Sequence, residues 1–311
     1  MNTPVFILIN RNCCQGKGWK KWNAVRDQVL KRLPGAEEVV TENADEMHSR
    51  LSGIVKENDE SRIISAGGDG SIHALINALL DSGQNSKHIV GAIGLGSSND
   101  FLKPFKTFIG DVPVRVNTSA PPVYQDAGKI GYTDANGIER QKYFIVNASV
   151  GVTAEGNWHF NHPGFILKWL KKNNTSAAIT FAALKAIFTY RNKTVIARFN
   201  GDEKSIVVSN INLLKIPYVA GSLHYKQPIL PDDGKLGVNM CVDMSRIELF
   251  KTLLQLERGN FAASEKRLSA MVNCFELSSS SPLVFECDGE TSQSSSIKIS
   301  VAPKAIRLLA S

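Results

Sequence analysis

Short apolar runs alternate with amphipathic segments along residues 5–94, and this alternation constrains the fold more than any other feature of the chain. The runs have the length of β-strands, and the segments between them have the apolar spacing of helices. Strand and helix in alternation imply a parallel sheet with crossover helices, so we expect a Rossmann-like α/β domain. The predicted strands are residues 5–10, 37–41, 61–68 and 88–94, and the predicted helices are residues 19–33, 44–58 and 71–83.

After Pro121 and Pro122 the pattern changes to β-rich runs separated by Asn-Gly, Gly-Asp and Asp-Gly turns. This pattern predicts an antiparallel sandwich or barrel, interrupted by a helical insertion at 162–191 and a further helix at 245–260. We treat the serine-rich segments 278–282 and 292–296 as loops. The expected domains are residues 1–122 and 123–302, with residues 303–311 packing back on the first. The predicted strands are residues 124–134, 139–151, 193–201, 204–214, 235–244 and 282–289.

Composition narrows the class of partner. The chain of 311 residues is 43% hydrophobic and 21% charged, which is typical of a globular protein. Its 36 Lys and Arg exceed its 29 Asp and Glu, and the formal charge of +7 favours anionic partners such as nucleotides or phosphate headgroups. The basic residues lack the interleaved aromatics of a base-stacking surface, so we expect no nucleic-acid partner. Five cysteines without a C-x-x-C pair indicate reduced thiols and no zinc site.

Neither of the two most apolar segments has the pattern of a targeting or spanning element. The run "PVFILIN" lacks a basic lead and a cleavage site, so we interpret it as the first strand. The stretch 175–190 is interrupted by Lys185 and is shorter than the ~20 residues that cross a bilayer. We therefore expect a soluble, cytoplasmic protein, with peripheral contact at the inner membrane face as a further expectation.

The segment "ISAGGDGSIHALINALL" joins a predicted strand to a predicted helix through Gly67, Gly68, Asp69, Gly70 and Ser71. Glycines expose backbone N–H groups, and a helix N-terminus carries partial positive charge, so this turn suits phosphate. An aspartate fits such a site when it acts through bound Mg²⁺. The alternative is a glycine-rich turn in which the aspartate caps the helix. The segment matches neither G-x-G-x-x-G nor the P-loop pattern.

The motif resembles the "GGDG[TS]" signature that lipid kinases of the diacylglycerol kinase type share with NAD kinases and phosphofructokinases. A second segment, "GLGSSNDF", follows the next predicted strand and resembles the "GTGNDFA" element of diacylglycerol kinase catalytic domains. Two such turns at strand ends fit a ligand crevice at the carboxyl edge of a parallel sheet. The resemblance implies an ATP site in a cleft between the two domains, built from Asn10, Lys17, Thr41, Gly67, Gly68, Asp69, Gly70, Ser71, Gly96, Ser97, Asn99 and Asp100.

Two downstream segments extend the resemblance over nearly the whole chain. "CDGE" resembles the family's "DGE" element, which implies that Asp288 and Glu290 act in catalysis together with Asp69. Read without the family, it is an ordinary Asp-Gly hairpin turn. "LPDDGKLGV" resembles the segment that holds a structural or regulatory Mg²⁺ in bacterial members. That resemblance implies metal ligation by the Asp233 side chain and the carbonyls of Leu230 and Lys235, against the alternative of a solvated turn.

The sequence also departs from the family pattern. The first loop reads "NRNCCQGKG" where "NPxSG" is usual, His73 stands where Asn or Glu is common, and Gly94 stands where Pro is usual. The rivals are weaker, because the chain has no second glycine-rich loop of the NAD kinase kind and no "T-x-D-N-D" element of phosphofructokinases. Another class also stays open, a nucleotide- or lipid-binding sensor without turnover.

The helical insertion carries six Lys or Arg and no Asp or Glu over residues 162–193. Ile166, Trp169 and Leu170 share one helical face, which suits an anionic bilayer surface or a long-chain lipid. The alternative is a pair of helices that pack at a domain interface. The sequence thus predicts an ATP- and Mg²⁺-dependent lipid kinase whose acceptor is diacylglycerol or a related lipid. A homodimer is compatible with the sequence, which does not fix the oligomeric state.

Overall fold

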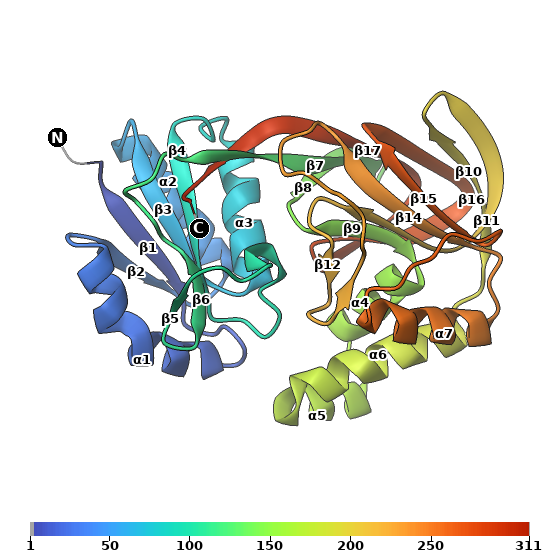
Figure 1. Ribbon diagram of the computed structural model, residues 1–311, viewed down its shortest axis with the longest axis horizontal. Helices are drawn as coiled ribbons and strands as arrows, with labels where there is room; N and C mark the ends of the chain where they lie inside the picture. The colour runs from blue at the N-terminus through green and yellow to red at the C-terminus, as the bar shows by residue number, and fades with distance from the viewer. Residues whose placement is uncertain (1–2, 311) are drawn as a thin grey trace. The chain divides into compact units, whose positions relative to one another are not determined.

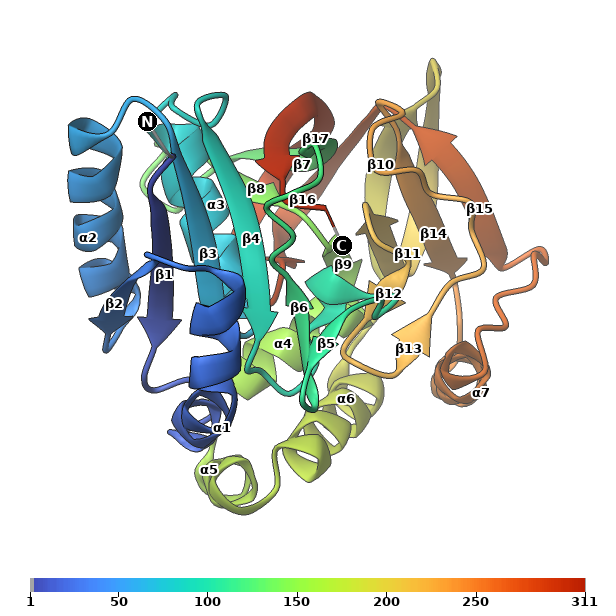
Figure 2. The same cartoon turned by 60° about the vertical axis from the view of Figure 1, so that its left-hand side comes forward.

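The computed structural model describes residues 3–310, which divide into two compact units, residues 3–126 with 303–310, and residues 127–302. The first unit has a parallel sheet in the order β2-β1-β3-β4, with short antiparallel β6 beside β4 and a β5–β6 hairpin (Figures 1 and 2). Its elements are β1 (Val5–Asn10), α1 (Lys17–Arg32), β2 (Glu37–Thr41), α2 (Ala44–Glu57), β3 (Ser61–Gly67), α3 (Asp69–Asp81), β4 (His88–Gly94), the 3₁₀ turn η1 (Asp100–Leu102), β5 (Phe108–Ile109) and β6 (Val112–Arg115).

Helices cover both faces of this sheet, as a parallel sheet requires. Ile7 and Ile9 point to the face where Trp22 and Val25 of α1 pack. Because side chains alternate along a strand, Phe6 and Leu8 point to the opposite face, on the side of α2 and α3 (Figure 2). The predicted α/β class is therefore confirmed, with the predicted strands and helices of residues 5–94 present.

The second unit is β-rich and antiparallel, with the strand order β15-β14-β11-β10-β16-β17. β9 pairs with both β11 and β16, and β7 pairs with β8 and β17. Its strands are β7 (Val123–Thr133), β8 (Glu139–Phe144), β9 (Asn147–Gly151), β10 (Lys193–Phe199), β11 (Asp202–Leu214), β12 (Tyr218–Val219), β13 (Leu223–His224), β14 (Leu236–Val242), β15 (Arg267–Val272), β16 (Cys274–Cys287) and β17 (Glu290–Leu308).

The inward faces of these strands make one apolar core. Alternate residues such as Ile211 and Leu213 on β11 and Phe275 and Leu277 on β16 are buried in it. The prediction that 278–282 and 292–296 are loops was wrong, because both lie within paired strands, where Ser278 pairs with Ser296. The pairing of β16 with β17 continues beyond these segments, with a register irregularity between Ser278 and Leu283, and a polar composition does not reveal such pairing.

The second unit also carries four helices, which Figure 1 shows below its strands. They are α4 (Val152–Asn161), α5 (Phe165–Asn173), α6 (Thr175–Thr189) and α7 (Arg246–Glu257). The sequence did not predict α4, whose residues Gly156 and Thr153 are poor helix formers. Packing explains it, because a Cβ at Gly156 would lie 3.8 Å from Ala183 Cα and Ala186 Cβ of α6. No helix among residues 3–310 is long and apolar enough to cross a bilayer.

Candidate active site

Two glycine turns meet at the carboxyl ends of β3 and β4 in the first unit. These strands are adjacent and parallel, with Gly67 opposite Gly94. A Cβ on Gly96 would lie 2.6 Å from Gly68 Cα, and a Cβ on Gly68 would lie 3.2 Å from Gly96 Cα. Only glycine at both positions lets the two main chains approach this closely. The two motifs found in the sequence are therefore in direct backbone contact.

The first loop joins the same cluster through a side-chain hydrogen bond. Asn10 Nδ2 donates to Ser71 Oγ at 3.0 Å. A Cβ on Gly67 would lie 2.3 Å from that hydroxyl, so Ser71 fills the space that the missing side chain leaves. Asn10, Gly67 and Ser71 thus come together as predicted, and α3 begins between them with Gly68 as its N-cap.

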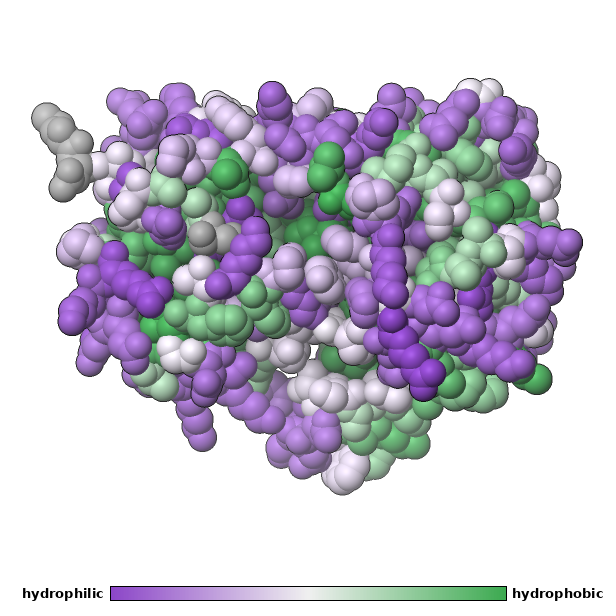
Figure 3. Space-filling model, viewed as in Figure 1, coloured by the Kyte–Doolittle hydropathy of each residue, from purple (hydrophilic) through white to green (hydrophobic). Residues whose placement is uncertain are grey.

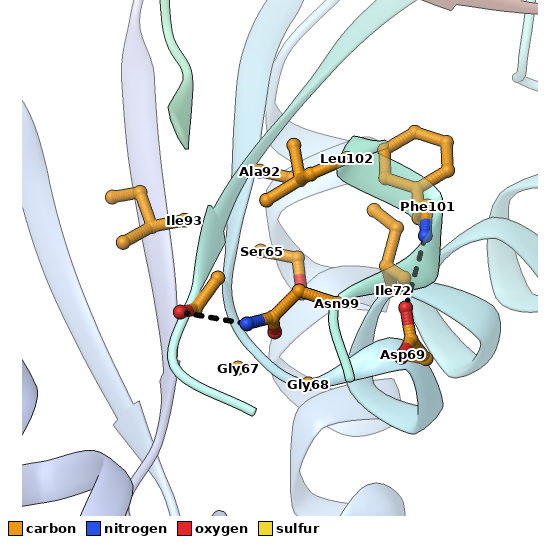
Figure 4. Close-up of a pocket in the computed structure, with 11 residues that line it drawn as sticks. Ser65, Gly67, Gly68, Asp69, Ile72, Ala92, Ile93, Asn99, Phe101 and Leu102 are labelled. Atoms are coloured by element: carbon orange, nitrogen blue, oxygen red, sulfur yellow. Dashed lines mark hydrogen bonds between the residues drawn. The ribbon is translucent and has the colours of Figure 1, made fainter. Parts of the chain in front are cut away.

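A small pocket lies at these turns (Figure 4). Its volume is about 200 Å³, including the part open to solvent, and both apolar and polar residues border it. The residues that line it are Ser65, Gly67, Gly68, Asp69, Ile72, Ala92, Ile93, Gly94, Asn99, Phe101 and Leu102.

Three polar residues predicted as ligand contacts hold the second turn in shape. Asn99 has φ +51, accepts a hydrogen bond from Gly96 N at 3.0 Å, and donates to the Gly94 carbonyl at 3.2 Å (Figure 4). Asp69 Oδ1 accepts from Phe101 N at 3.1 Å. The buried carboxylate of Asp100 pairs with Lys103 Nζ at 2.6 Å. Their observed role is therefore conformational, and ligand contact remains a prediction for each.

The remaining predicted nucleotide contacts lie around this cluster. Thr41 is 1% exposed and its hydroxyl donates to the Ile9 carbonyl, so its side chain faces the sheet. Lys17, Gly70 and Ser97 are exposed. His73, whose place in the family pattern was unexplained, is buried on α3 next to Asn77.

The sequence did not single out Lys21 or Cys14 as part of this site. Lys21 Nζ donates to the Gly96 carbonyl at 3.1 Å, one helical turn after Lys17 on the same face of α1. A hydrogen bond with Cys13, followed by the charge of Lys21, lowers the pKa of the Cys14 thiol, whereas the same hydrogen bond and burial raise the pKa of Cys13. All five cysteines are free thiols. Its spacing from Lys17, one helical turn, was the sequence pattern that could have placed Lys21 in this site.

A tight Asp-Gly turn in the second unit carries the predicted catalytic carboxylates. Asp288 and Gly289 have φ +48 and +92, and Cys287 pairs with Glu290 on either side of them. This is the hairpin geometry that favours Asp-Gly, so the interpretation of this segment as an Asp-Gly hairpin turn is correct for its backbone. Glu290 is exposed at the start of β17.

The Asp288 carboxylate lies in a nest of main-chain donors. Its Oδ1 accepts from Val146 N and Asn147 N at 2.9 and 3.0 Å, and its Oδ2 accepts from Ile145 N at 2.9 Å. These three main-chain donors fix the position and orientation of the carboxylate. The turn is further fixed by Asn161 Nδ2, which donates to the Gly289 carbonyl at 2.8 Å.

Glu286 is a second buried carboxyl beside this turn, and the sequence did not identify it. It is 0% exposed, accepts from Asn147 Nδ2 at 2.5 Å and from Gly289 N at 2.8 Å. Burial, with a smaller contribution from the charge of Asp288, raises the pKa of Glu286 to about 8. Its position in a strand did not indicate that the side chain is buried, because the alternation of residues between the two faces of a strand does not by itself distinguish a buried acid from an exposed one.

The three residues predicted to bind Mg²⁺ also come together. The carbonyls of Leu230 and Lys235 and the carboxylate of Asp233 converge on one point, and the Nζ atom of Lys215 lies there. No group of three or more His, Cys, Asp or Glu side chains within residues 3–310 has the arrangement of a metal site.

Comparison with known families decides the class of protein. Residues 4–118 match the diacylglycerol kinase catalytic domain, and residues 147–310 match the YegS C-terminal NAD kinase beta sandwich-like domain. The chain belongs to the diacylglycerol kinase-like lipid kinases. The predicted family is thereby confirmed, and membership implies a kinase that uses ATP.

Individual relatives are distant. The chain is 28% identical over 102 residues to YtlR of Bacillus subtilis, covering 32% of each protein. It is 28% identical over 113 residues to "Probable lipid kinase YegS-like" of Chromohalobacter salexigens, covering 34% of this chain and 32% of that one. The matched segment thus spans about a third of the length of these curated relatives.

Solved structures show the fold. A diacylglycerol kinase from Bacillus anthracis aligns with a TM-score of 0.67 at 12% identity, over 99% of this chain and 97% of that one. Yeast NADH kinase, solved with NADH, aligns with a TM-score of 0.53 at 11% identity, over 99% and 83%. The lipid kinase and NAD kinase folds are therefore shared, as the α/β and β-rich order of the two units predicted.

Substitution of Gly96 by alanine tests the contact between the turns. The new Cβ would collide with Gly68 Cα, so we expect ATP affinity to fall at least about tenfold and the free energy of unfolding to fall by about 1–3 kcal/mol. Isothermal titration and urea unfolding measure both. Gly53→Ala in α2, where a Cβ meets open space, is the matched control and should not lower either. Unchanged ATP affinity in Gly96→Ala would contradict this assignment.

Glu286 predicts a pH dependence of stability. Between its ordinary pKa of 4.5 and the folded value of about 8, the unfolded chain loses this proton while the folded chain keeps it. The free energy of unfolding therefore falls as pH rises through this window. Glu286→Gln removes that contribution, so its stability relative to wild type should increase by a few kcal/mol from about pH 5 to about pH 9.

Denaturant unfolding across that pH range measures the effect of the Glu286 substitution. Glu257→Gln, at an exposed position in α7, is the control and should follow the wild-type curve. A Glu286→Gln curve parallel to wild type at all pH values would show that Glu286 is ionised in the folded protein.

Proposed function

We propose that this protein transfers the γ-phosphate of ATP to a lipid hydroxyl, converting diacylglycerol to phosphatidic acid. The observation that carries the proposal is the backbone contact between Gly68 and Gly96 at the ends of two adjacent parallel strands. In a chain of the lipid kinase family, this contact builds an anion site at the N-terminus of α3. Backbone N–H groups of the glycines there suit the phosphates, because glycine has no side chain that would block close approach.

The charges around the glycine turns support nucleotide binding. Lys21 already reaches the Gly96 carbonyl, and Lys17 is exposed one turn before it, so both lie where phosphate charge needs compensation. Asp69, half-buried next to the turns, offers carboxylate oxygen, the donor type that Mg²⁺ prefers. Nucleotide-bound Mg²⁺ would neutralise charge on the phosphates, and Asp69 would hold it.

The Asp288 turn supplies the acid–base chemistry in this proposal. Its carboxylate is held by three main-chain donors, which fix its position at the turn. Asp288 or Glu290 would orient the lipid hydroxyl and accept its proton as the oxygen attacks the γ-phosphorus and ADP departs. Most of the rate enhancement would come from positioning and electrostatics, because phosphoryl transfer needs little covalent help.

Exposed apolar helix faces support a membrane-bound substrate. On α5, Phe165 and Trp169 are 88% and 61% exposed, while Leu167 packs against α6. On α7, Ile247 and Leu254 are exposed with Phe250 between them. Figure 3 shows hydrophobic surface beside hydrophilic surface along the lower edge, in the area of α5 and α6. Exposed basic residues border these faces, at Lys168, Lys172, Lys185, Arg246 and Lys251.

This combination suits the interface of an anionic bilayer, where apolar side chains insert and lysines meet lipid phosphate. The α5 face also lies close to the catalytic turn along the chain. Asn161, the last residue of α4, holds the Gly289 carbonyl, and Phe165 begins α5 shortly afterwards. A lipid headgroup at the surface of α5 would therefore lie near Asp288.

Transfer of labelled γ-phosphate to vesicles tests the function. We expect transfer to diacylglycerol, and Asp288→Asn and Glu290→Gln should each lower turnover at least about 100-fold, the scale of a lost acid–base group. Asp202→Asn, at an exposed position in β11, is the matched control and should keep full turnover. Normal phosphate transfer by both carboxylate variants would contradict this mechanism.

The same assay separates the alternatives. Transfer to sphingosine, ceramide, monoacylglycerol, phosphatidylglycerol or NAD, but not to diacylglycerol, would reassign the acceptor. Saturable ATP binding without transfer to any of them would favour the sensor.

Vesicle sedimentation tests the helix faces. Trp169→Ser should weaken binding to phosphatidylglycerol vesicles about tenfold, because it removes a large exposed aromatic from the inserted face. Leu268→Ser on β15, a similarly exposed apolar side chain away from these helices, should leave binding unchanged. We also expect weaker binding to neutral phosphatidylcholine vesicles. Equal loss in both variants would show that the helix faces are not the membrane contact.

A further inference from the structure

A buried lysine lies where the family resemblance places a divalent cation. The side chain of Lys215 is 0% exposed and follows β11 directly. Its Nζ atom donates to the Leu230 carbonyl and to the Lys235 carbonyl at 2.9 Å each, and lies 3.4 Å from Asp233 Oδ1. These three acceptors are the same atoms that the resemblance assigns to Mg²⁺.

The two carbonyl distances of 2.9 Å are those of hydrogen bonds from an ammonium group, and the 3.4 Å contact with Asp233 is a longer ion pair. Hydrogen bonds from nitrogen to oxygen are typically about 2.7–3.2 Å, whereas Mg²⁺ binds oxygen at about 2.0–2.1 Å and Ca²⁺ at about 2.3–2.6 Å. An ammonium has three donors, and the cluster presents three acceptors. Mg²⁺ requires six ligands in near-octahedral geometry, which two carbonyls and one carboxylate do not provide by themselves.

Charge argues in the same direction. A divalent ion among these oxygens would lie against the buried Lys215 ammonium, and like charges at such short separation are strongly unfavourable where water is excluded. The lysine is also fixed at its base, because the backbone N–H groups of Lys215 and Ile216 both donate to the Val146 carbonyl, at 2.9 and 3.1 Å. The residues present therefore do not fit the metal.

We infer that the Lys215 ammonium is the resident cation of the Leu230–Lys235 loop, which this protein holds in place without a divalent metal. The Asp233 carboxylate serves both the lysine and the loop, since its Oδ1 also accepts from Lys235 N at 3.0 Å. The site thus keeps the ligands of a cation site but takes its positive charge from the chain itself.

This arrangement connects the loop to the catalytic turn. Val146, whose carbonyl accepts from the backbone of Lys215, donates its own N–H to Asp288 Oδ1 at 2.9 Å. The lysine therefore fixes the loop to the same short segment that positions the Asp288 carboxylate. Divalent metal should then be required only for the nucleotide and not for the fold of this unit.

Thermal unfolding of the full-length protein without nucleotide tests the inference. After dialysis against EDTA, wild type should have the same Tm in EDTA, MgCl₂ and CaCl₂ at equal ionic strength, and emission spectrometry should find no stoichiometric metal. Lys215→Met should lower the Tm in EDTA by about 5–10 °C, because it removes a buried ammonium and leaves two carbonyls and the half-buried Asp233 carboxylate without their cation.

Two neighbouring positions provide matched controls. Lys235 and Asp232 are exposed, so Lys235→Met and Asp232→Asn remove the same groups nearby and should keep the wild-type Tm. If Lys215→Met does not fold, the Tm of Asp233→Asn tests the inference instead. It should lower the Tm equally in EDTA and in MgCl₂, because the lysine loses a carboxylate and no metal is involved.

Three results would overturn the inference. They are a wild-type Tm that falls by several degrees in EDTA and recovers in MgCl₂, a stoichiometric divalent metal in the purified protein, and a Lys215→Met variant as stable as wild type in EDTA.

Discussion

The parallel register of β3 and β4 is the constraint on which the first unit's candidate site depends. Because Gly67 lies opposite Gly94, the two loops that follow leave the sheet at the same height. Gly68 and Gly96 then meet with no side chain between them, and Asp69 and Asn99 tie the second loop to that position through main-chain hydrogen bonds. A shift by one residue would turn every one of these groups to the other face of the sheet.

Much of this arrangement was predictable from sequence. Alternating strand and helix patterns fix a parallel sheet, and such a sheet brings successive loops to one edge. The resemblance to the family then pointed to the two glycine turns, which the structure brings into contact at Gly68 and Gly96. The serine-rich strands and α4 were missed for a common reason. Their local composition disfavours the element that they form, and pairing with β17 or packing on α6 supplies the stability.

The buried ionisable groups were beyond sequence reasoning. Nothing in "FEC" indicates that Glu286 is fully buried, and nothing in "LLKIP" indicates that Lys215 lies among oxygens from a loop further along the chain. Both depend on contacts between segments far apart in sequence, and both change the chemistry of a site that the motif alone had described. A ligand pattern therefore identifies where a positive charge is required, but not which group supplies it.

β17 gives the chain an order of assembly. Its last residues belong to the first unit, where Arg307 pairs with Ile89 of β4, Asn85 holds the Ala305 carbonyl and Lys304 N donates to Asp126. These residues are synthesised after the entire β-rich unit. The edge of β4 must therefore stay unpaired there while the ribosome completes the intervening strands, and an unpaired strand edge is prone to association with other chains. The first unit is encoded first but completed last.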